Sequence, residues 1–279
     1  MTLIAQITDL HLRPSGLTCY RVSDTNMLAE RAIRAILGLE HRPDAVVITG
    51  DLTDRDDPRE YALARHILAR LPMPIYMIPG NHDTSEGMRS AFSDYPGISE
   101  ASGEKLYYTA DIGSLRLIAL DSNVPGNPHG LLGKAQLDWL SETLAADDRP
   151  TMLAIHHPPA STGIPHMDNI GLMDSEALAE VIAPHTHVER IICGHVHRPI
   201  VAAFAGKIMT LAPSVAHQLM LDFKEDSPSM FSFEPAAYFL HQHTPKSGTV
   251  THTAYVENYP GPFPFWSDEG VTWPGDKPE

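Results

Sequence analysis

The hydrophobic positions of this chain form five short runs, and each run ends in Asp, Asn or His. The runs cover 3–7, 45–48, 75–78, 152–155 and 190–193. Runs of four or five apolar residues are typical of strands that are buried on both faces. Ligands bind beyond the carboxyl ends of strands in open α/β sheets. The polar residues that follow the five runs are therefore expected to converge on one site.

Between these runs, apolar residues recur at the spacing of an amphipathic helix. A helix is predicted after Asp24, a candidate N-cap, and another from Pro58, because proline is favoured in a first turn. Two more are expected after Gly133 and over 174–183. The alternation predicts βαβ units and a central sheet covered by helices. From residue 200 the pattern changes to short, antiparallel strands, at 200–204, 207–211, 236–242 and 249–256.

The composition favours a soluble, intracellular protein with one large α/β domain, or a core with an appendage. The chain has 279 residues and a formal net charge of -15. Such a charge argues against a polymeric nucleic acid as partner, because nucleic-acid binding depends on Lys and Arg. Two bound divalent ions would return about four positive charges locally, so a small anionic substrate can still be attracted.

The ends and cysteines of the chain also bear on its location. The first residues open directly into a strand pattern without the features of a secretory signal, and no run approaches the roughly 18 apolar residues of a membrane span. The two cysteines, Cys19 and Cys193, are expected to be free thiols, although a bridge between them stays an alternative. A cytoplasmic protein without membrane partners is predicted.

The residues after the five runs have the chemistry of a metal site. Asp, His and Asn without Cys are hard to borderline ligands, which favour Mn²⁺, Fe, Co²⁺ or Zn²⁺. Their number exceeds what one ion needs, so two ions are predicted. Each pair taken singly also fits a turn, a helix cap or a buried histidine, but all five together favour metal binding. The candidates are Asp9, His11, Asp51, Asp54, Asn81, His82, Asp83, His156, His157, His195 and His197.

The motifs D-x-H, GD-x-x-D, GNHD, HHP and GHVH, in this order, resemble those of the calcineurin-like metallophosphoesterases. Within that family, the chain is similar to the bacterial class III cyclic nucleotide phosphodiesterases and the related glycerophosphodiesterases. The motifs span residues 9–197, and the phrases RPDAVVITGDL and MIPGNHD strengthen the likeness. The resemblance implies a four-layer α/β/β/α sandwich. Its core would be 1–204, and a β-rich part, 205–279, would complete the second sheet and form an oligomerisation arm.

The resemblance also implies which side chains hold the two divalent ions, which would be Mn, Fe, Zn or Co. Asp51 and a hydroxide would bridge ions about 3.5 Å apart. His157 would support the ligands without binding metal. One ion would be held by Asp9, His11, Asp51 and His197, and the other by Asp51, Asn81, His156 and His195.

Further residues take catalytic or substrate-binding roles by the same resemblance. His82 and the metal ligand Asn81 would both contact the substrate, and His82 would bind its phosphate or donate a proton to the leaving group. Asp54 would orient His82 or, alternatively, cap the helix at Pro58. Arg55 matches a phosphate-binding arginine, but the acidic residues after it favour a surface ion pair.

His217 is expected in the active site, and Tyr20 is expected to line the substrate pocket. The remaining histidines of the β-rich part are expected to be structural, namely His241, His243 and His252. The tail 259–274, rich in proline and aromatic residues, would either pack over the domain or reach a second subunit, and a homodimer or dimer-based oligomer is predicted.

The predicted function is hydrolysis of small phosphodiesters, such as cyclic nucleotides or glycerophosphodiesters, to phosphomonoesters by a dinuclear metal centre. One alternative is a phosphomonoesterase that acts on nucleotides or phosphoproteins. A nuclease is disfavoured by the net charge of -15. A non-catalytic scaffold would be expected to have lost ligands, and all seven are present in this chain.

Overall fold

The computed structural model describes residues 1–101 and 103–263. Its helices are α1 (Thr25–Leu37), α2 (Pro58–Leu68), α3 (Ser85–Phe92), α4 (Lys134–Ala146), α5 (Pro165–Asp168) and α6 (Ser175–Ile182). Its strands are β1 (Thr2–Ile7), β2 (Ala45–Ile48), β3 (Ile75–Met77), β4 (Tyr108–Ile112), β5 (Leu115–Ala119), β6 (Thr151–Ala154), β7 (Val188–Cys193), β8 (Ile200–Phe204), β9 (Lys207–Leu211), β10 (Gln218–Leu219), β11 (Phe231–Ser232), β12 (Ala237–Thr244) and β13 (Gly248–Tyr255).

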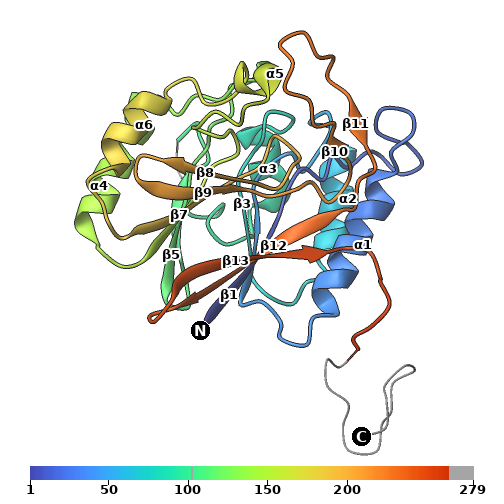
Figure 1. The fold of residues 1–279 in the computed structure, drawn as a ribbon, viewed down its shortest axis with the longest axis horizontal. Coiled ribbons are helices and arrows are strands. Elements are labelled where there is room, and N and C mark those ends of the chain that lie inside the picture. The colour runs from blue at the N-terminus through green and yellow to red at the C-terminus, as the bar shows by residue number, and fades with distance from the viewer. Residues whose placement is uncertain (102, 264–279) are drawn as a thin grey trace, which may run out of the picture.

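Two large sheets lie face to face, with helices on both outer sides (Figure 1). The first sheet has the order β13-β12-β1-β2-β3 and is covered by α1, α2 and α3. The second sheet has the order β4-β5-β6-β7-β9-β8 and is covered by α4 and α6. This arrangement is the α/β/β/α sandwich that the motifs imply.

Side chains alternate between the two faces of the second sheet and so contribute to two hydrophobic cores, one shared with the first sheet and one under the covering helices. Met152 and Ile192 pack into the core that is shared with the first sheet. Their neighbours Leu153 and Ile191 point to the opposite face and pack with α4 and α6. Because successive side chains of a strand lie on opposite faces, runs that are apolar at every position are needed to fill both layers.

The five apolar runs form β1, β2, β3, β6 and β7, which confirms the predicted strands. They belong to two sheets, however, instead of the single central sheet that the alternation suggests. Within each sheet the strands are parallel and in register, with Ile7 beside Ile48 and Ala154 beside Ile192. The carboxyl ends of the strands therefore lie together, and the polar residues that follow them can meet.

The predicted helices are also confirmed. The Asp24 side chain accepts a hydrogen bond from Met27 N at 3.1 Å, so Asp24 caps α1, and Pro58 is the first residue of α2. The segment between Asp83 and Gly133 contains α3 and the β4–β5 hairpin, which are absent from the predicted elements.

The C-terminal part contributes to both sheets. β8 and β9 form a hairpin in the second sheet, so the proposed boundary at residue 204 falls inside this hairpin. β9 pairs with β7 in parallel, whereas an antiparallel region was expected. β12 and β13 extend the first sheet beside β1. The tail aromatics Phe265, Trp266 and Trp273 lie outside the described residues. Among the described helices, none has the length and apolar character needed to cross a bilayer.

Polar side chains are buried between the two sheets where β12 faces β7. His241 Nε2 lies 2.9 Å from Gln6 Oε1, and His241 Nδ1 lies 2.9 Å from Thr251 Oγ1. Burial, together with the nearby Arg190, lowers the pKa of His241 to about 3. The role of His241 in this part of the protein is to join strands, in line with the expectation that it is structural.

The lowered pKa of His241 should make the stability of the metal-free protein depend on pH. Histidine in the unfolded chain has a pKa near 6.5, so the unfolded state binds more protons than the folded state between that value and about 3. The free energy of unfolding should fall as the pH is lowered through this window, by at most about 1.4 kcal/mol per pH unit from this residue. His241→Gln should flatten the profile, measured by urea unfolding at a series of pH values. Parallel profiles for the two proteins would contradict this assignment.

Candidate metal centre

The loops that follow β1 and β2 run side by side and hold the first ligands. Asp9 N donates a hydrogen bond to Gly50 O at 3.0 Å, and His11 N donates to Asp51 O at 2.9 Å. The backbone is left-handed, with φ between 45° and 71°, at five of the predicted ligands: Asp9, His11, Asp51, His195 and His197. Residues other than glycine adopt this conformation infrequently, and it is concentrated at functional sites.

Two glycines allow the loops to approach each other. A Cβ atom on Gly80 would lie 2.1 Å from Asp51 Oδ1, and one on Gly50 would lie 2.3 Å from His156 Nδ1. Both contacts are too short for any other residue. Glycine therefore precedes Asn81 and Asp51 because their loops meet at van der Waals distance.

The first group of predicted ligands consists of Asp9, His11, Asp51 and His197, whose ligand atoms lie within 4.8 Å of one another. His197 Nε2 is 3.3 Å from Asp9 Oδ1 and 3.0 Å from His11 Nε2. His11 Nε2 is 3.6 Å from Asp51 Oδ2.

The second group surrounds the Asn81 side chain. Asn81 Oδ1 lies 3.2 Å from His156 Nε2 and 2.9 Å from His195 Nδ1. His156 Nε2 is also 3.5 Å from Asp51 Oδ2, the oxygen that faces His11 in the first group. The structure thus brings all seven predicted ligands together, with Asp51 between the two groups.

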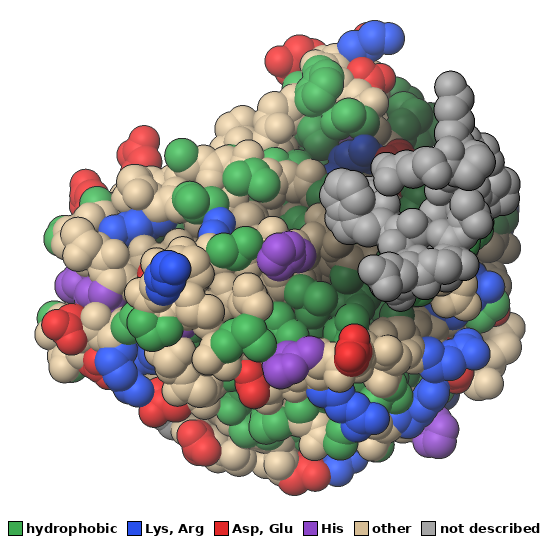
Figure 2. Space-filling model, turned by 60° about the horizontal axis from the view of Figure 1, so that its bottom comes forward, with side chains coloured by type: hydrophobic (Ala, Val, Ile, Leu, Met, Phe, Trp, Pro, Cys, Tyr) green, Lys and Arg blue, Asp and Glu red, His purple; other side chains and the backbone are tan. Residues whose placement is uncertain are grey.

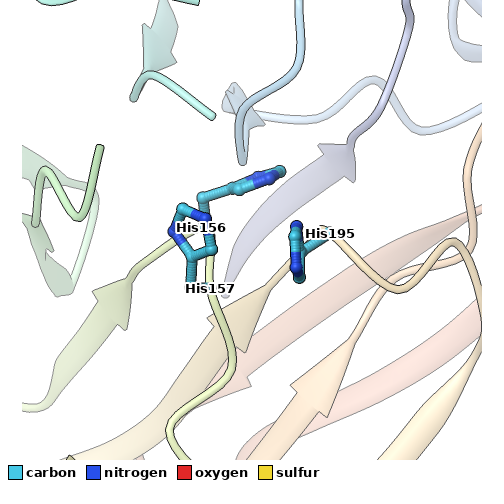
Figure 3. A group of neighbouring side chains, drawn as sticks. All are labelled: His156, His157 and His195. Atoms are coloured by element: carbon cyan, nitrogen blue, oxygen red, sulfur yellow. The ribbon is translucent and has the colours of Figure 1, made fainter. Parts of the chain in front are cut away.

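His157 is close to this centre but has other partners. Figure 3 shows its ring together with those of His156 and His195, just beyond the ends of two neighbouring strands. Its Nδ1 is 2.7 Å from Ser122 Oγ, and its Nε2 is 3.2 Å from Pro128 O. Burial and the nearby histidines lower its pKa well below the usual value, so the ring is neutral. Both nitrogens therefore have partners outside the centre, and the supporting role of His157 stays a prediction.

The orientation of the ligand histidines suits metal ions. His156 Nδ1 lies 2.7 Å from Thr49 O, and His197 Nδ1 lies 2.9 Å from His217 O. A carbonyl oxygen accepts only, so both rings carry a proton on Nδ1, and Nε2 is the atom that faces the centre and can bind an ion there in place of a proton. Metal-binding histidines usually have this second hydrogen bond, which fixes the tautomer.

Two ligand nitrogens also face each other across the centre. His11 Nε2 lies 3.0 Å from His197 Nε2, and His11 Nδ1 is 3.6 Å from Asp54 Oδ1. Two bare nitrogens at 3.0 Å would repel each other, so a proton or a cation is needed between them. His195 Nε2 is buried without a hydrogen-bond partner in the described part of the chain. The residues present therefore fit divalent ions.

The electrostatics of the centre favour positive charge. Burial lowers the pKa of His156, but the carboxylates of Asp51 and Asp9 outweigh it and raise the value to about 9. Burial would raise the pKa of Asp51, yet His156 and His82 hold it well below its usual value. Asp51 is thus ionised at neutral pH although it is only 2% exposed. A buried carboxylate of this kind attracts protons or metal ions.

His82 lies beside the two groups and is oriented by the backbone. Its Nδ1 lies 2.8 Å from the Asp54 carbonyl oxygen, and its main-chain N donates to Asp51 Oδ1 at 2.9 Å. Burial lowers the pKa of His82, but the charge of Asp51 and the bond to Asp54 leave it above its usual value. The expected link between His82 and Asp54 therefore exists, but it involves the main chain of Asp54 and not its carboxylate.

The Asp54 carboxylate has different partners. It accepts hydrogen bonds from Arg13 Nη1 at 2.9 Å and Cys19 Sγ at 3.1 Å, and it faces His11. The alternative role as a helix cap is wrong, because Asp57 caps α2. Arg55 has an exposed side chain whose Nε is 3.4 Å from Asp54 Oδ2, so it forms an ion pair as expected, but with the aspartate before it and not with those after it.

A pocket of about 360 Å³ opens onto the centre. Tyr20 and His217 line it, as predicted, and their rings are 5.4 Å apart at an interplanar angle of 82°. The His217 ring also lies 4.8 Å from the Phe231 ring, at an interplanar angle of 51°. The rest of the wall is largely apolar and was not predicted: Pro128, Met167, Ile170, Val196, Leu219 and Met230.

Two further buried residues join the ligand loops and are absent from the predicted roles. The Asp83 carboxylate accepts hydrogen bonds from Leu52 N, Thr53 N and Gly80 N at 2.9–3.0 Å. Asn123 Nδ2 donates to Gly80 O at 2.6 Å and Asp83 O at 2.9 Å. A signal for Asn123 exists, because it follows the apolar run 117–120 in the same way that ligands follow the other runs.

Known proteins are similar to this chain in sequence or in fold. A model of the calcineurin-like phosphoesterase family matches residues 2–199. A protein of Arcobacter nitrofigilis named "Probable glycerophosphodiester phosphodiesterase GpdQ" is 34% identical over 96% of this chain and 98% of its own length. The 3',5'-cyclic adenosine monophosphate phosphodiesterase CpdA of Escherichia coli K12 is 33% identical over 77% of this chain and 76% of its own.

Among solved structures, a dimetal phosphatase from Danio rerio has the same fold, with a TM-score of 0.62 and 15% identity over 92% of this chain and 99% of its own. The family and the clustered His and Asp side chains together indicate a two-metal centre. The motifs, the sandwich and these relatives agree, and this chain belongs to the calcineurin-like phosphoesterase family.

Proposed function

We propose that this chain is a metal-dependent phosphodiesterase that hydrolyses small phosphodiesters, such as cyclic nucleotides or glycerophosphodiesters, to phosphomonoesters. The observation that carries the proposal is the position of Asp51 between two groups of ligands, beside a pocket of substrate size. Relatives that align with most of this chain are named as phosphodiesterases, which supports the diester over the monoester.

In this proposal each group of ligands holds one divalent ion, of Mn, Fe, Zn or Co. When bound, such ions supply Lewis acidity, which lowers the pKa of water and polarises a phosphoryl oxygen. Asp51 belongs to both groups and so fixes the position of one group relative to the other. Its ionised state, and the Nδ1 bonds that turn Nε2 of His156 and His197 toward the centre, support this assignment.

His82 acts on the leaving group. Its Nδ1 is held by the Asp54 carbonyl, so Nε2 is the nitrogen that can serve the substrate. The raised pKa of His82 favours a proton on this nitrogen near neutral pH. His82 lines the pocket and can give that proton to the departing alkoxide.

The pocket walls suit a small diester with one apolar or planar ester group. Tyr20 and Phe231 form an aromatic wall, with ring centroids 5.3 Å apart, and Met167 and Ile170 also line the pocket. Among the described residues, no Lys or Arg lines this pocket. On the far side of Tyr20 and His82, an outer pocket is lined by Arg13, Arg21 and Arg55. A polar or anionic group of the substrate would lie there.

The surface charge supports a small substrate. On the face shown in Figure 2, Lys and Arg side chains are interspersed with Asp and Glu and form no continuous basic surface. Together with the net charge of -15, this distribution disfavours a nucleic acid polymer. We also propose a cytoplasmic location, on the basis of the cysteine content, and a homodimer or dimer-based oligomer, on the basis of the aromatic tail.

The function can be tested with a pair of matched substrates. The protein, reconstituted in turn with Mn²⁺, Fe²⁺, Co²⁺ and Zn²⁺, should hydrolyse bis-p-nitrophenyl phosphate faster than p-nitrophenyl phosphate. A preference for the monoester would favour the phosphomonoesterase alternative. Failure to cleave either compound with any of the four metals would overturn the proposal.

A further inference from the structure

The ligands of the metal centre come from two different sheets, and each group combines ligands of both. Asp51 follows β2 of the first sheet, whereas His195 follows β7 of the second. The separation of these ligands therefore depends on what joins the carboxyl ends of β2 and β7. A displacement of the sheets by a few tenths of an ångström would change the distances, in both groups, between the ligands of the first sheet and those of the second.

Gln6 joins these two strand ends directly. It lies on β1 and is fully buried, with 0% of its surface exposed. Its Nε2 donates hydrogen bonds to Thr49 Oγ1 at 2.9 Å and to the Cys193 carbonyl oxygen at 2.9 Å. Thr49 precedes Asp51 by two residues, and Cys193 precedes His195 by two residues.

Thr49 links Gln6 to a third ligand. The Thr49 carbonyl oxygen accepts the Nδ1 proton of His156 at 2.7 Å, and that bond fixes the tautomer of His156. Gln6 is therefore hydrogen-bonded to Thr49, which orients His156, and to Cys193, which lies two residues before His195. Gln6 does not line the pocket beside the metal centre, so it can affect the ligands only through Thr49 and Cys193.

The partners of Gln6 require an amide. The Cys193 carbonyl can only accept, so the NH₂ group must face it, and both of its protons are used. Gln6 Oε1 then accepts from His241 Nε2 at 2.9 Å, while His241 Nδ1 accepts from the Thr251 hydroxyl at 2.9 Å. A carboxylate at position 6 would place an acceptor against an acceptor. The orientation of the Gln6 side chain is thus fixed from three sides.

We infer that Gln6 is a positioning residue, which sets the distance between the ligands of the first sheet and those of the second and thereby the affinity for the ion pair. This inference rests on the proposed function, because it concerns the same metal centre. It assigns to His241 the task of holding the Gln6 amide in the orientation that bridges the sheets.

The test compares Gln6→Leu with Thr2→Val. Leucine has a similar volume to glutamine but no hydrogen-bond donors. Thr2 is a matched control, since it is buried on the same strand and also joins the second sheet, with its Oγ1 3.0 Å from both Ser114 Oγ and Ser114 N. It lies at the opposite end of β1 from the metal ligands. Metal-free proteins are titrated with Mn²⁺ by calorimetry and with Co²⁺ by absorption, and their unfolding midpoints are measured without metal.

Gln6→Leu should weaken the affinity for at least one ion by about 10–100-fold and change the Co²⁺ spectrum, because loss of a residue that supports metal ligands has effects of this size. Thr2→Val should lower the unfolding midpoint of the metal-free protein while the isotherm and the spectrum stay as in the unmodified protein. Equal affinities for Gln6→Leu and the unmodified protein, or equal losses for both variants, would overturn the inference.

Two further measurements keep the outcome clear. If Gln6→Leu does not fold, His241→Phe takes its place, because it leaves the Gln6 amide intact but removes the donor that orients it. Reduced affinity in His241→Phe supports the inference, and unchanged affinity refutes it. Failure of the unmodified protein to bind two ions would count against the proposed function instead.

Discussion

Asp51→Ala is expected to abolish binding of the ion pair and to lower turnover of bis-p-nitrophenyl phosphate by about 10³-fold or more. Asp51 is the carboxylate that faces both groups, with Oδ2 3.6 Å from His11 Nε2 and 3.5 Å from His156 Nε2. Two bound ions contribute several kcal/mol to transition-state stabilisation, and each 1.4 kcal/mol corresponds to about a factor of ten in rate. The metal content after reconstitution and dialysis, measured by mass spectrometry, is the direct readout.

Asp57→Asn provides the control for the loss of an aspartate in the same loop. The Asp57 carboxylate caps α2 and pairs with Arg59 at the surface, so its change should leave the metal content unaltered. Retention of two ions per chain by Asp51→Ala would show that Asp51 is not shared between the groups.

His82→Ala should have the second largest effect, and this effect should depend on the leaving group. For diesters with poor leaving groups, such as alkyl esters, kcat should fall by about 10²–10⁴-fold, the usual contribution of a general acid. For p-nitrophenyl esters the loss should be much smaller, because p-nitrophenolate departs without a proton. The measurement is kcat for a series of diesters that differ in leaving-group pKa.

The metal content of His82→Ala should stay unchanged, because His82 Nδ1 is bonded to the Asp54 carbonyl and the residue belongs to neither assigned set of ligands. Equal losses of kcat along the whole series would assign His82 to phosphate binding and not to proton transfer. A loss of metal in parallel with activity would place His82 among the ligands.

Much of the fold could be predicted from local sequence signals. The run Ala45–Ile48 is apolar at every position and is followed by Gly50 and Asp51, so both the strand and its polar end are visible in the sequence. The division of such strands between two sheets is not local. It depends on which strand pairs with which, and the sequence alone suggested this only through the family resemblance.

Helix α3 shows why some elements escape prediction. Its sequence, SEGMRSAF, contains Gly87 and two serines, which have low helix propensity. Yet a Cβ atom at Gly87 would lie 2.6 Å from Asp56 Oδ1 and 2.6 Å from Tyr61 Cε2, so packing against the neighbouring helix requires glycine there. A tertiary contact has overridden the local preference.

Within the site, residue types could be predicted but not which atom of each residue is used. Asp54 was expected near His82, and the structure shows that its carbonyl bonds His82 while its carboxylate faces His11 and Arg13. This distinction depends on the path of the chain after Asp51. Gln6 carries no signal at all, because a single polar residue in an apolar strand gains its meaning only from the opposite sheet.

The left-handed backbone at Asp9, His11, Asp51, His195 and His197 restricts how this centre can evolve. Asp, Asn and His tolerate that conformation better than other residues with side chains. Their side chains also offer oxygen and nitrogen ligands to a metal ion. The backbone conformation and the metal therefore favour the same few residue types. Cysteine or glutamate could bind an ion equally well but would add backbone strain at these positions. New metal preferences should therefore arise by exchange among Asp, Asn and His, and a thiolate-rich descendant of this centre would first need different loops.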